Sequence, residues 1–187
     1  MTKKVQIPAI TLESANNWHD YALLDSGDGK TLERFGPYTL IRPEPQVIWK
    51  PSLSTDAWKN AHARMQEVQK EYGGQWTLQQ PIDKSWVLCY RNLKFQVQLG
   101  TSRHLGVFPE QASHWEWIIN QVSTAGRPLK VLNLFGDTGL ATLAVASVSA
   151  EVTHVDSSKH SLTWASHNLA LSGMANKPVR WIAEDAL

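Results

Sequence analysis

The sequence has little cysteine, little net charge and no long apolar run. Cys89 is the only cysteine among 187 residues, so one chain can form neither an internal disulfide nor a cysteine-rich metal site. The net charge of +1 gives no reason to expect a broad basic surface for nucleic acid. No apolar stretch is long enough to cross a bilayer, and residues 1–20 contain no apolar core typical of a signal peptide. We therefore expect a cytoplasmic protein without a membrane segment.

What the sequence does contain is a recognisable pattern in its C-terminal half. An apolar run at 131–134 enters a turn that carries Gly136 and Gly139. A segment of small residues follows at 140–148, and a second apolar run ends in Asp156. The order is strand, glycine loop, helix, strand and carboxylate, which predicts a βαβ unit.

Each part of this unit suits a nucleoside ligand. Glycines lack a Cβ, so the backbone can turn sharply and approach a ligand closely. The helix that follows begins with unpaired N–H groups and a partial positive charge. Asp156 follows Gly136 by about 20 positions, where an acid can accept two ribose hydroxyls. We therefore expect an adenosine-containing ligand.

The loop also bears on which ligand this is. Dinucleotide sites favour G-x-G-x-x-G, whereas this loop has Gly136-x-x-Gly139 with Asp137 between them. A carboxylate there would repel a pyrophosphate and suits a ligand that carries a cation, such as the sulfonium and ammonium of S-adenosylmethionine. The local pattern favours S-adenosylmethionine, and a dinucleotide or a purely structural βαβ unit remain alternatives.

The rest of the chain predicts two domains. Residues 1–99 are expected to form a small α+β domain, and residues 100–187 a Rossmann-like domain. The strands expected in the first domain lie at 21–24, 30–35, 38–42 and in a hairpin at 86–99, with a turn at 25–29 and an irregular lead-in at 1–18. One helix is expected there, capped by Ser54, running through Tyr72 and ended by Gly73 and Gly74. Cys89 is expected to be a small buried residue.

The second domain is expected to alternate helices and strands. The helices are predicted at 109–122, 140–148 and 159–171, the last capped by Ser157 or Ser158, and the strands at 131–134, 152–155 and 179–182. No pair of histidines suggests a metal site: His160 and His167 are too far apart along one helix to share an ion.

These residues resemble the class I S-adenosylmethionine-dependent methyltransferases, in particular the branch of bacterial 23S rRNA cytosine-C5 methyltransferases. The resemblance is specific over 104–187 and looser before it. The matching segments are 104–111, 131–139, 152–159, Trp164 and Ala165 with Asn168, 171–173 and 181–187. It implies an α/β fold: the N-terminal half of a Rossmann-like methyltransferase sheet, preceded by the small α+β domain.

The resemblance also implies a cofactor site for S-adenosylmethionine. The residues expected around the methionine part are Asn133, Phe135, Gly136, Asp137, Thr138 and Gly139, with Phe108 and Gln111 closing over its end. Asp156 would accept the ribose hydroxyls and Ser157 would border the adenine pocket. Asp185, beside Ala186, would accept the adenine amino group. The alternatives are a core role for Phe108 and a helix-cap role for Asp156.

One family segment is absent from the sequence. Members of the family carry an Asp-Pro-Pro-x-Phe segment after a fourth strand, where it holds the target base. Without it we name no catalytic residue, and we expect a truncated chain that is inactive alone. We also expect the strand at 131–134 to be an unpaired apolar edge, through which the chain could form a homodimer.

The sequence thus supports three readings of function. The first is an S-adenosylmethionine-dependent methyltransferase, acting on RNA, of which this chain carries the cofactor-binding part. The second is a degenerate module that binds S-adenosylmethionine, or nothing, without catalysis. The third is a nicotinamide-dependent oxidoreductase, which rests on the glycine loop and the acid alone. RNA enters through the resemblance and not through charge, and no metal is expected.

Overall fold

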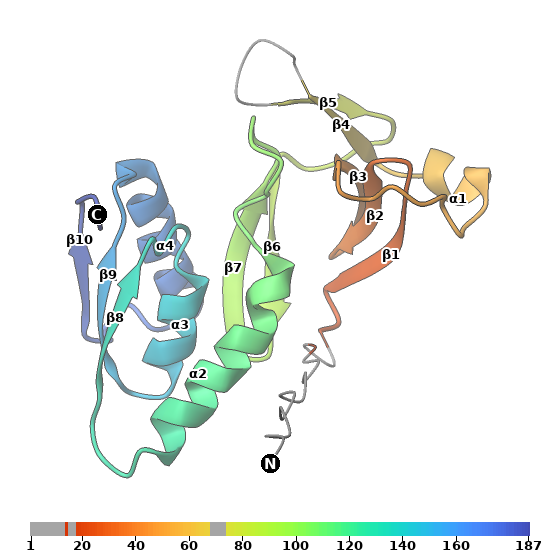
Figure 1. The fold of residues 1–187 in the computed structure, drawn as a ribbon. Coiled ribbons are helices and arrows are strands. Elements are labelled where there is room, and N and C mark those ends of the chain that lie inside the picture. Colours follow the sequence, from red (N-terminus) through yellow and green to blue (C-terminus); the bar gives the residue numbers. More distant parts are fainter. Residues whose placement is uncertain (1–13, 15–17, 68–73) are drawn as a thin grey trace, which may run out of the picture.

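The computed structural model describes residues 14, 18–67 and 74–187 (Figure 1). Its strands form a five-stranded, a two-stranded and a three-stranded sheet, in chain order. Most of the irregular lead-in expected at 1–18 lies outside the described residues. The boundary expected near residue 100 stays a prediction, and one continuous apolar core includes buried residues from both sides of it.

The N-terminal sheet has the strand order β1-β2-β3-β4-β5. Its neighbouring strands are antiparallel except for the parallel pair β3 and β4. The bounds are β1 Tyr21–Gly27, β2 Lys30–Phe35, β3 Tyr38–Pro43, β4 Ala63–Glu67 and β5 Gly74–Leu78. The three strands expected first are confirmed, although β1 continues through residue 27, so the turn between β1 and β2 contains only Asp28 and Gly29.

The long helix expected from Ser54 to Tyr72 is wrong. Ser54 does cap a helix, but α1 spans only Thr55–Lys59, and the chain then forms β4. Ala61, Ala63 and Met65 are all buried, and this spacing of two belongs to a strand. Because an apolar run of this length fits either period, pairing with β3 and β5 decided the outcome. The rest of the expected helix, 68–72, lies outside the described residues, and Gly74 begins β5 instead of ending a helix.

The expected hairpin is present as β6 Ser85–Tyr90 and β7 Leu93–Gln98. The prediction that Cys89 is buried is wrong, because its side chain is exposed. Trp86, Leu88 and Tyr90 fill the core, so the alternating side chains of Val87 and Cys89 face solvent. Because residues 86–90 are all apolar or aromatic, the sequence of β6 shows no alternation from which the exposure of Cys89 could be predicted.

The C-terminal half follows the predicted order of helices and strands. Its sheet is parallel, with the order β10-β9-β8. The bounds are η1 Pro109–Gln111, α2 Ala112–Thr124, β8 Lys130–Leu134, α3 Leu140–Ser147, β9 Glu151–Val155, α4 Lys159–Leu171 and β10 Val179–Ile182. Ser158 is the cap of α4, since its hydroxyl accepts the N–H of Ser161 at 3.1 Å.

Helices α3 and α4 lie between the β8–β10 sheet and the β6–β7 hairpin (Figure 1). Side chains of α4 satisfy the backbone of β7, which has β6 on only one side. Asn168 Oδ1 accepts the N–H of Gln96 at 2.9 Å, and Ser172 Oγ, which caps the end of α4, accepts that of Lys94 at 2.9 Å. The hairpin is therefore held against the parallel unit by polar contacts as well as by the core.

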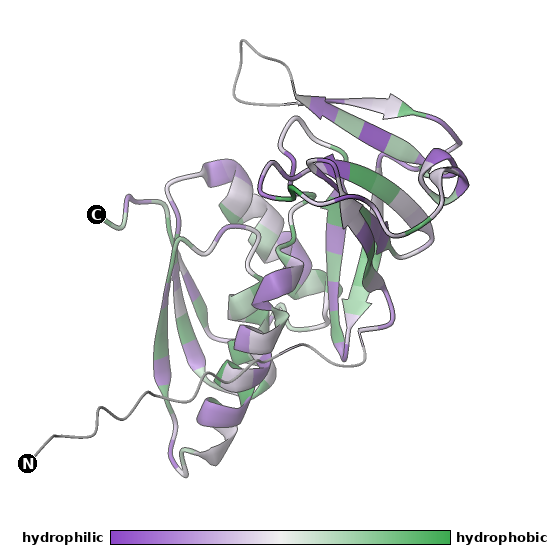
Figure 2. Cartoon of the chain, turned by 45° about the vertical axis from the view of Figure 1, so that its right-hand side comes forward, coloured by the Kyte–Doolittle hydropathy of each residue, from purple (hydrophilic) through white to green (hydrophobic). Residues whose placement is uncertain are grey.

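Both outer strands of the β8–β10 sheet, β8 and β10, lack a further neighbour among the described residues, and part of one face at β8 is open. β8 pairs only with β9 in the described chain, and Leu132 and Leu134 are 61% and 43% exposed. Figure 2 shows apolar residues along the strands of this sheet. The edge position expected for 131–134 is thus observed. In the described residues no helix is both long and apolar enough to cross a membrane.

Candidate cofactor-binding site

The loop between β8 and α3 has an unusual backbone. Phe135, Asp137 and Gly139 have positive φ angles of 53°, 45° and 87°. Left-handed backbone is strained for residues other than glycine, at a cost of roughly 1–3 kcal/mol each, and such strain concentrates at binding sites. We call residues 135–139 the glycine loop. Its strain is the first structural sign that the loop binds a ligand.

Neighbouring side chains leave no room for a Cβ at either glycine of the loop. A Cβ on Gly136 would lie 2.3 Å from Cε1 of His154, and a Cβ on Gly139 would lie 2.7 Å from Cβ of Ala165. The loop therefore rests directly on β9 and α4, with no space for a side chain at either position. This packing holds the strained backbone in place.

A chain of buried polar groups lies under the loop. Asn133 Nδ2 donates to Thr142 Oγ1 at 3.0 Å, and Thr142 Oγ1 bonds His154 Nδ1 at 2.9 Å. The His154 side chain is fully buried, and its Nε2 has no partner among the described atoms. Burial lowers the pKa of His154 below its ordinary value, against the opposing effect of Asp156 and Asp137. The imidazole is therefore neutral at pH 7.

Asp156 connects the glycine loop to α4. Its Oδ2 accepts the N–H of Asp137 at 2.9 Å, and its Oδ1 accepts the N–H of Ser158 at 2.8 Å. The second contact is to the backbone of Ser158, and since Ser158 is the cap of α4, Asp156 does not have the helix-cap role considered as the alternative. The first contact places the carboxylate directly beside the loop. Each oxygen has a further lone pair, so the carboxylate can still accept hydroxyl groups from a ligand.

A cavity of about 370 Å³ opens over the loop. The sequence-predicted residues that line it are Phe108, Gln111, Asn133, Phe135, Gly136, Asp137 and Thr138. The start of α3 faces the same cavity through Leu140 and Ala141, and this end of the helix has no side-chain cap. Its free N–H groups favour an anionic group such as a carboxylate. Phe108 is half-exposed, so it is a wall of the cavity and not a core residue.

Asp137 contributes a negative charge to the wall of this cavity. Its Oδ1 accepts the Ser161 hydroxyl at 3.1 Å, while its Oδ2 is buried without a partner in the part of the chain that the structure describes. An unpaired buried carboxylate oxygen is costly unless a donor or a cation reaches it. Asp137 thus brings a carboxylate to the cavity wall, with one oxygen bonded to α4 and the other buried.

The other predicted site residues do not line this cavity. Gly139 is buried as the N-cap of α3. Asp156 is half-buried beside the loop, Ser157 is exposed, and Asp185 and Ala186 follow β10 in the C-terminal tail. Asp156 N–H donates to Ile182 O at 3.1 Å, so β10 ends next to Asp156. Asp185 is exposed, and its Oδ1 accepts the N–H of Leu187 at 3.2 Å.

Sequence reasoning missed several residues of the site. Val107, Trp115, Leu134, Leu140 and Ala141 also line the cavity. Trp115 is a buried residue of α2, and no local signal in the sequence distinguishes a core residue from one that lines a cavity. The contact between Thr138 Oγ1 and Gly106 O, 2.6 Å long and buried, was also missed. Gly106 has a φ of 87°, a conformation that favours glycine. A glycine at this position is the one sequence signal that could have pointed to a special backbone there.

Comparison with solved structures identifies the fold. An S-adenosylmethionine-dependent methyltransferase from Agrobacterium tumefaciens is 42% identical, with a TM-score of 0.88, over 100% of this chain and 60% of that one. The chain has the fold of S-adenosylmethionine-dependent methyltransferases. A protein from Streptococcus mutans described as such a methyltransferase is 17% identical, with a TM-score of 0.69, over 91% of this chain and 47% of that one.

The chain is also similar to part of a structure solved with a tRNA. The structure of aTrm5 with tRNALeu is 12% identical, with a TM-score of 0.52, over 88% of this chain and 47% of that one. No family model and no curated protein matches the chain. The chain spans less than two thirds of the length of each of these three structures, so it corresponds to only part of each methyltransferase fold.

The site residues fit S-adenosylmethionine. Gly136 and Gly139 let the loop pack directly on His154 and Ala165, and Gly136 also lines the cavity. The cavity offers helix N–H groups for a carboxylate, and Asp137 brings a negative charge to its wall. Asp156 stands beside the loop, where a ribose would extend from the methionine part. In the described residues, no group of three or more His, Cys, Asp or Glu side chains could hold a metal.

Proposed function

We propose that the chain is the cofactor-binding part of a methyltransferase that binds S-adenosylmethionine and methylates RNA. The single observation that carries this proposal is the contact between Asp156 and the glycine loop. The Asp156 carboxylate, to which we assign the ribose, accepts a loop N–H at 2.9 Å, and this loop forms one wall of a 370 Å³ cavity. A family member needs these two features together, because the sugar and the methionine part belong to one ligand.

The bound cofactor supplies an electrophilic methyl group on a sulfonium. The residues of this chain bind and orient it. Asp156 accepts the ribose hydroxyls, the start of α3 faces the methionine carboxylate, and Asp137 balances the positive charge. Phe108 and Gln111 close over the methionine end and exclude water. Methyl transfer then depends mainly on positioning, since displacement at the methyl carbon requires an in-line nucleophile. We assign no catalytic acid or base.

The first test concerns the ligand. S-adenosylhomocysteine titrated into the chain in a calorimeter should bind with a stoichiometry of one. NADH, titrated with fluorescence detection, should not bind, because Asp137 lies where a pyrophosphate would pass. Binding of NADH without S-adenosylhomocysteine would favour the oxidoreductase alternative. Binding of neither would leave only a structural βαβ unit.

RNA as the methyl acceptor is the finer part of the proposal. Its support is the resemblance of residues 104–187 to cytosine-C5 methyltransferases of 23S rRNA. Incubation with methyl-labelled S-adenosylmethionine and total RNA, with total protein in parallel, tests it. Label in 5-methylcytosine of RNA is expected from the protein in its full natural length. Cofactor binding without transfer by that protein would favour the non-catalytic module.

We also propose that the open edge of β8 pairs with a second copy of the chain. Leu132 and Leu134 are exposed beside an unpaired backbone edge, which favours pairing with another strand. Light scattering after size-exclusion chromatography should give twice the monomer mass. The variant Leu132→Lys should shift it to the monomer, while Leu78→Lys, an equally exposed position on β5, should not. A wild-type monomer at high concentration would contradict the pairing.

A further inference from the structure

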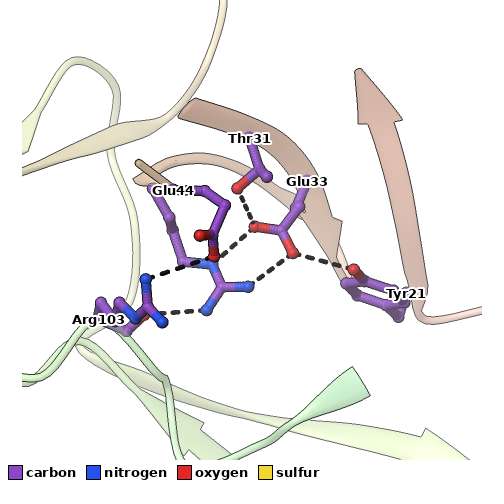
Figure 3. Close-up of polar contacts among 6 residues, drawn as sticks. Tyr21, Thr31, Glu33, Glu44 and Arg103 are labelled. Carbon is purple, nitrogen blue, oxygen red and sulfur yellow. Dashed lines mark hydrogen bonds and ion pairs between the residues drawn. The ribbon is translucent and has the colours of Figure 1, made fainter. Parts of the chain in front are cut away.

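Glu33 and Arg42 form a buried ion pair in the N-terminal sheet, and both oxygens of the Glu33 carboxylate accept hydrogen bonds. Glu33 is 2% exposed, and its two carboxylate oxygens accept Arg42 Nε at 2.7 Å and Nη2 at 2.6 Å. Tyr21 and Thr31 donate their hydroxyls to the same carboxylate at 2.9 and 2.7 Å (Figure 3). A buried ion pair of this kind adds little stability over apolar residues, so its presence points to a role in specifying geometry.

The pair reaches beyond its own sheet. Arg42 Nη1 donates to the backbone carbonyl of Arg103 at 3.0 Å, and Arg103 forms an ion pair with Glu44 at 3.3 Å. Figure 3 shows Arg103 approaching Glu44 and the ion pair from a separate segment. We call residues 103–108 the linker, because they lie between β7 and η1 and lead directly into η1. Both contacts tie the beginning of the linker to β3 and the residue after it.

The other end of the linker reaches the cofactor site. Gly106 O accepts the Thr138 hydroxyl of the glycine loop, and Leu105 O accepts the N–H of Gln98 at 3.1 Å. Phe108 lines the cavity and stacks on His104 with ring centroids 4.9 Å apart. A continuous series of contacts therefore runs from Glu33 through the linker to Thr138.

The linker has empty space on both sides of its last residues. A second cavity of about 270 Å³ lies between the N-terminal sheet and the linker, and it shares Val107 and Phe108 with the cofactor cavity. Phe108 therefore borders both cavities, is 39% exposed and stacks on His104 of the same segment. With a cavity on each side, the position of Phe108 depends on the hydrogen bonds that hold the linker backbone.

We propose that the Glu33–Arg42 pair positions the linker, and through it Phe108 and Thr138, for binding of the cofactor. This inference rests on the proposed function. It makes Glu33 and Arg42 positioning residues, which touch no cofactor atom, and it assigns to the N-terminal sheet a part in cofactor affinity. Nothing in the local sequence around Glu33 or Arg42 indicates such a role.

The test compares two variants of the same sheet. Arg42→Lys keeps the charge but cannot bond both Glu33 oxygens and Arg103 O. Asp25→Asn is the matched control. Asp25 is also buried in the sheet, where its carboxylate accepts the Leu53 N–H at 2.8 Å and the Trp58 indole N–H at 2.9 Å, with no contact to the linker. Both variants should lower the melting temperature.

Affinity for S-adenosylhomocysteine, measured by calorimetry, separates positioning from stability. Arg42→Lys should weaken binding by about tenfold, the effect of one lost charged hydrogen bond, and Asp25→Asn should change it by less than about twofold. Thr138→Val should weaken binding similarly, and the double variant Arg42→Lys/Thr138→Val should lose less than the product of both. Unchanged affinity in Arg42→Lys, or an equal loss in Asp25→Asn, would overturn the inference.

Hydrogen exchange provides a readout without a ligand. In Arg42→Lys the amides of residues 103–108 and 135–139 should exchange faster than in the wild type, and in Asp25→Asn they should not. If the wild type does not bind S-adenosylhomocysteine, the proposed function fails, and exchange alone decides whether the pair positions the linker. Unchanged exchange in Arg42→Lys would overturn the inference whatever the wild type binds.

Discussion

The two ends of the candidate site differ in how the protein holds them. At the end proposed for the methionine part, the glycine loop rests on His154 and Ala165, and Thr138 binds the linker. At the end proposed for the adenine, Ser157 and Asp185 are exposed, and Asp185 accepts the N–H of Leu187, two positions away. Asp156 stands between them and touches both the loop and the start of α4.

This difference indicates which end is formed before a ligand arrives. A strained loop held on several sides keeps its shape, so ligand binding there costs little ordering of the protein. If Asp185 binds the adenine as proposed, its exposed side chain becomes fixed only when the ligand binds. We therefore expect substitutions at the loop to affect both stability and affinity, and substitutions at the tail to affect affinity alone.

The largest effect is expected from Gly136→Ala. Its Cβ would overlap the buried ring of His154, so the free energy of unfolding should fall by roughly 1–3 kcal/mol and binding of S-adenosylhomocysteine should be lost. Chemical denaturation and calorimetry measure the two effects. Gly100→Ala is the control, because the nearest atom to its Cβ would be 4.0 Å away. Normal binding by Gly136→Ala would show that the loop is not held rigidly.

The next effect is expected from Asp156→Asn. The amide cannot accept all the contacts of the carboxylate, so affinity for S-adenosylhomocysteine should fall by about tenfold to a hundredfold. Ser158→Ala removes the neighbouring helix cap and should lower stability by about 1 kcal/mol with no loss of affinity. Equal affinities of the two variants would place the sugar away from Asp156.

A smaller effect is expected from pH. The folded state lowers the pKa of His154, so the unfolded chain binds a proton more readily and stability falls as pH drops below the ordinary value of 6.5. The free energy of unfolding should fall between pH 7.5 and 5.5 by at most about 1.4 kcal/mol per pH unit. Denaturation at several pH values should show this slope in the wild type and in His167→Gln, an exposed control, but not in His154→Gln. The same slope in all three would assign it to other groups.

The smallest effect is expected from Asp185→Ala at the tail. Affinity for S-adenosylhomocysteine should fall by about twofold to tenfold, the effect of one hydrogen bond, and the free energy of unfolding should not change. Glu184→Ala, an exposed neighbour, should change neither quantity. A loss of stability in Asp185→Ala would mean that the tail is already ordered like the loop.

The sequence predicted the parts of the molecule that short segments determine. Gly136, Gly139 and Asp156 lie in the βαβ unit expected for them, because strand, loop and helix signals there follow each other within a few residues. The caps Ser54 and Ser158 were found for the same reason.

The sequence did not predict features that depend on distant neighbours. The prediction of helix at β4 is wrong because pairing with β3 and β5 determines that this segment is a strand. The prediction that Cys89 is buried is wrong because tertiary packing determines which face of the hairpin is exposed. The contact of Thr138 with Gly106 joins residues 32 positions apart, and the ion pair of Glu33 with Arg42 reaches Arg103 across 61 positions. No periodicity in the sequence reports such contacts.

The most direct test is a crystal structure of the chain with S-adenosylhomocysteine at saturating concentration. We predict the methionine part in the cavity above residues 135–138 and both ribose hydroxyls within hydrogen-bonding distance of the Asp156 carboxylate. A ligand bound elsewhere, or a sugar that does not contact Asp156, would contradict the account.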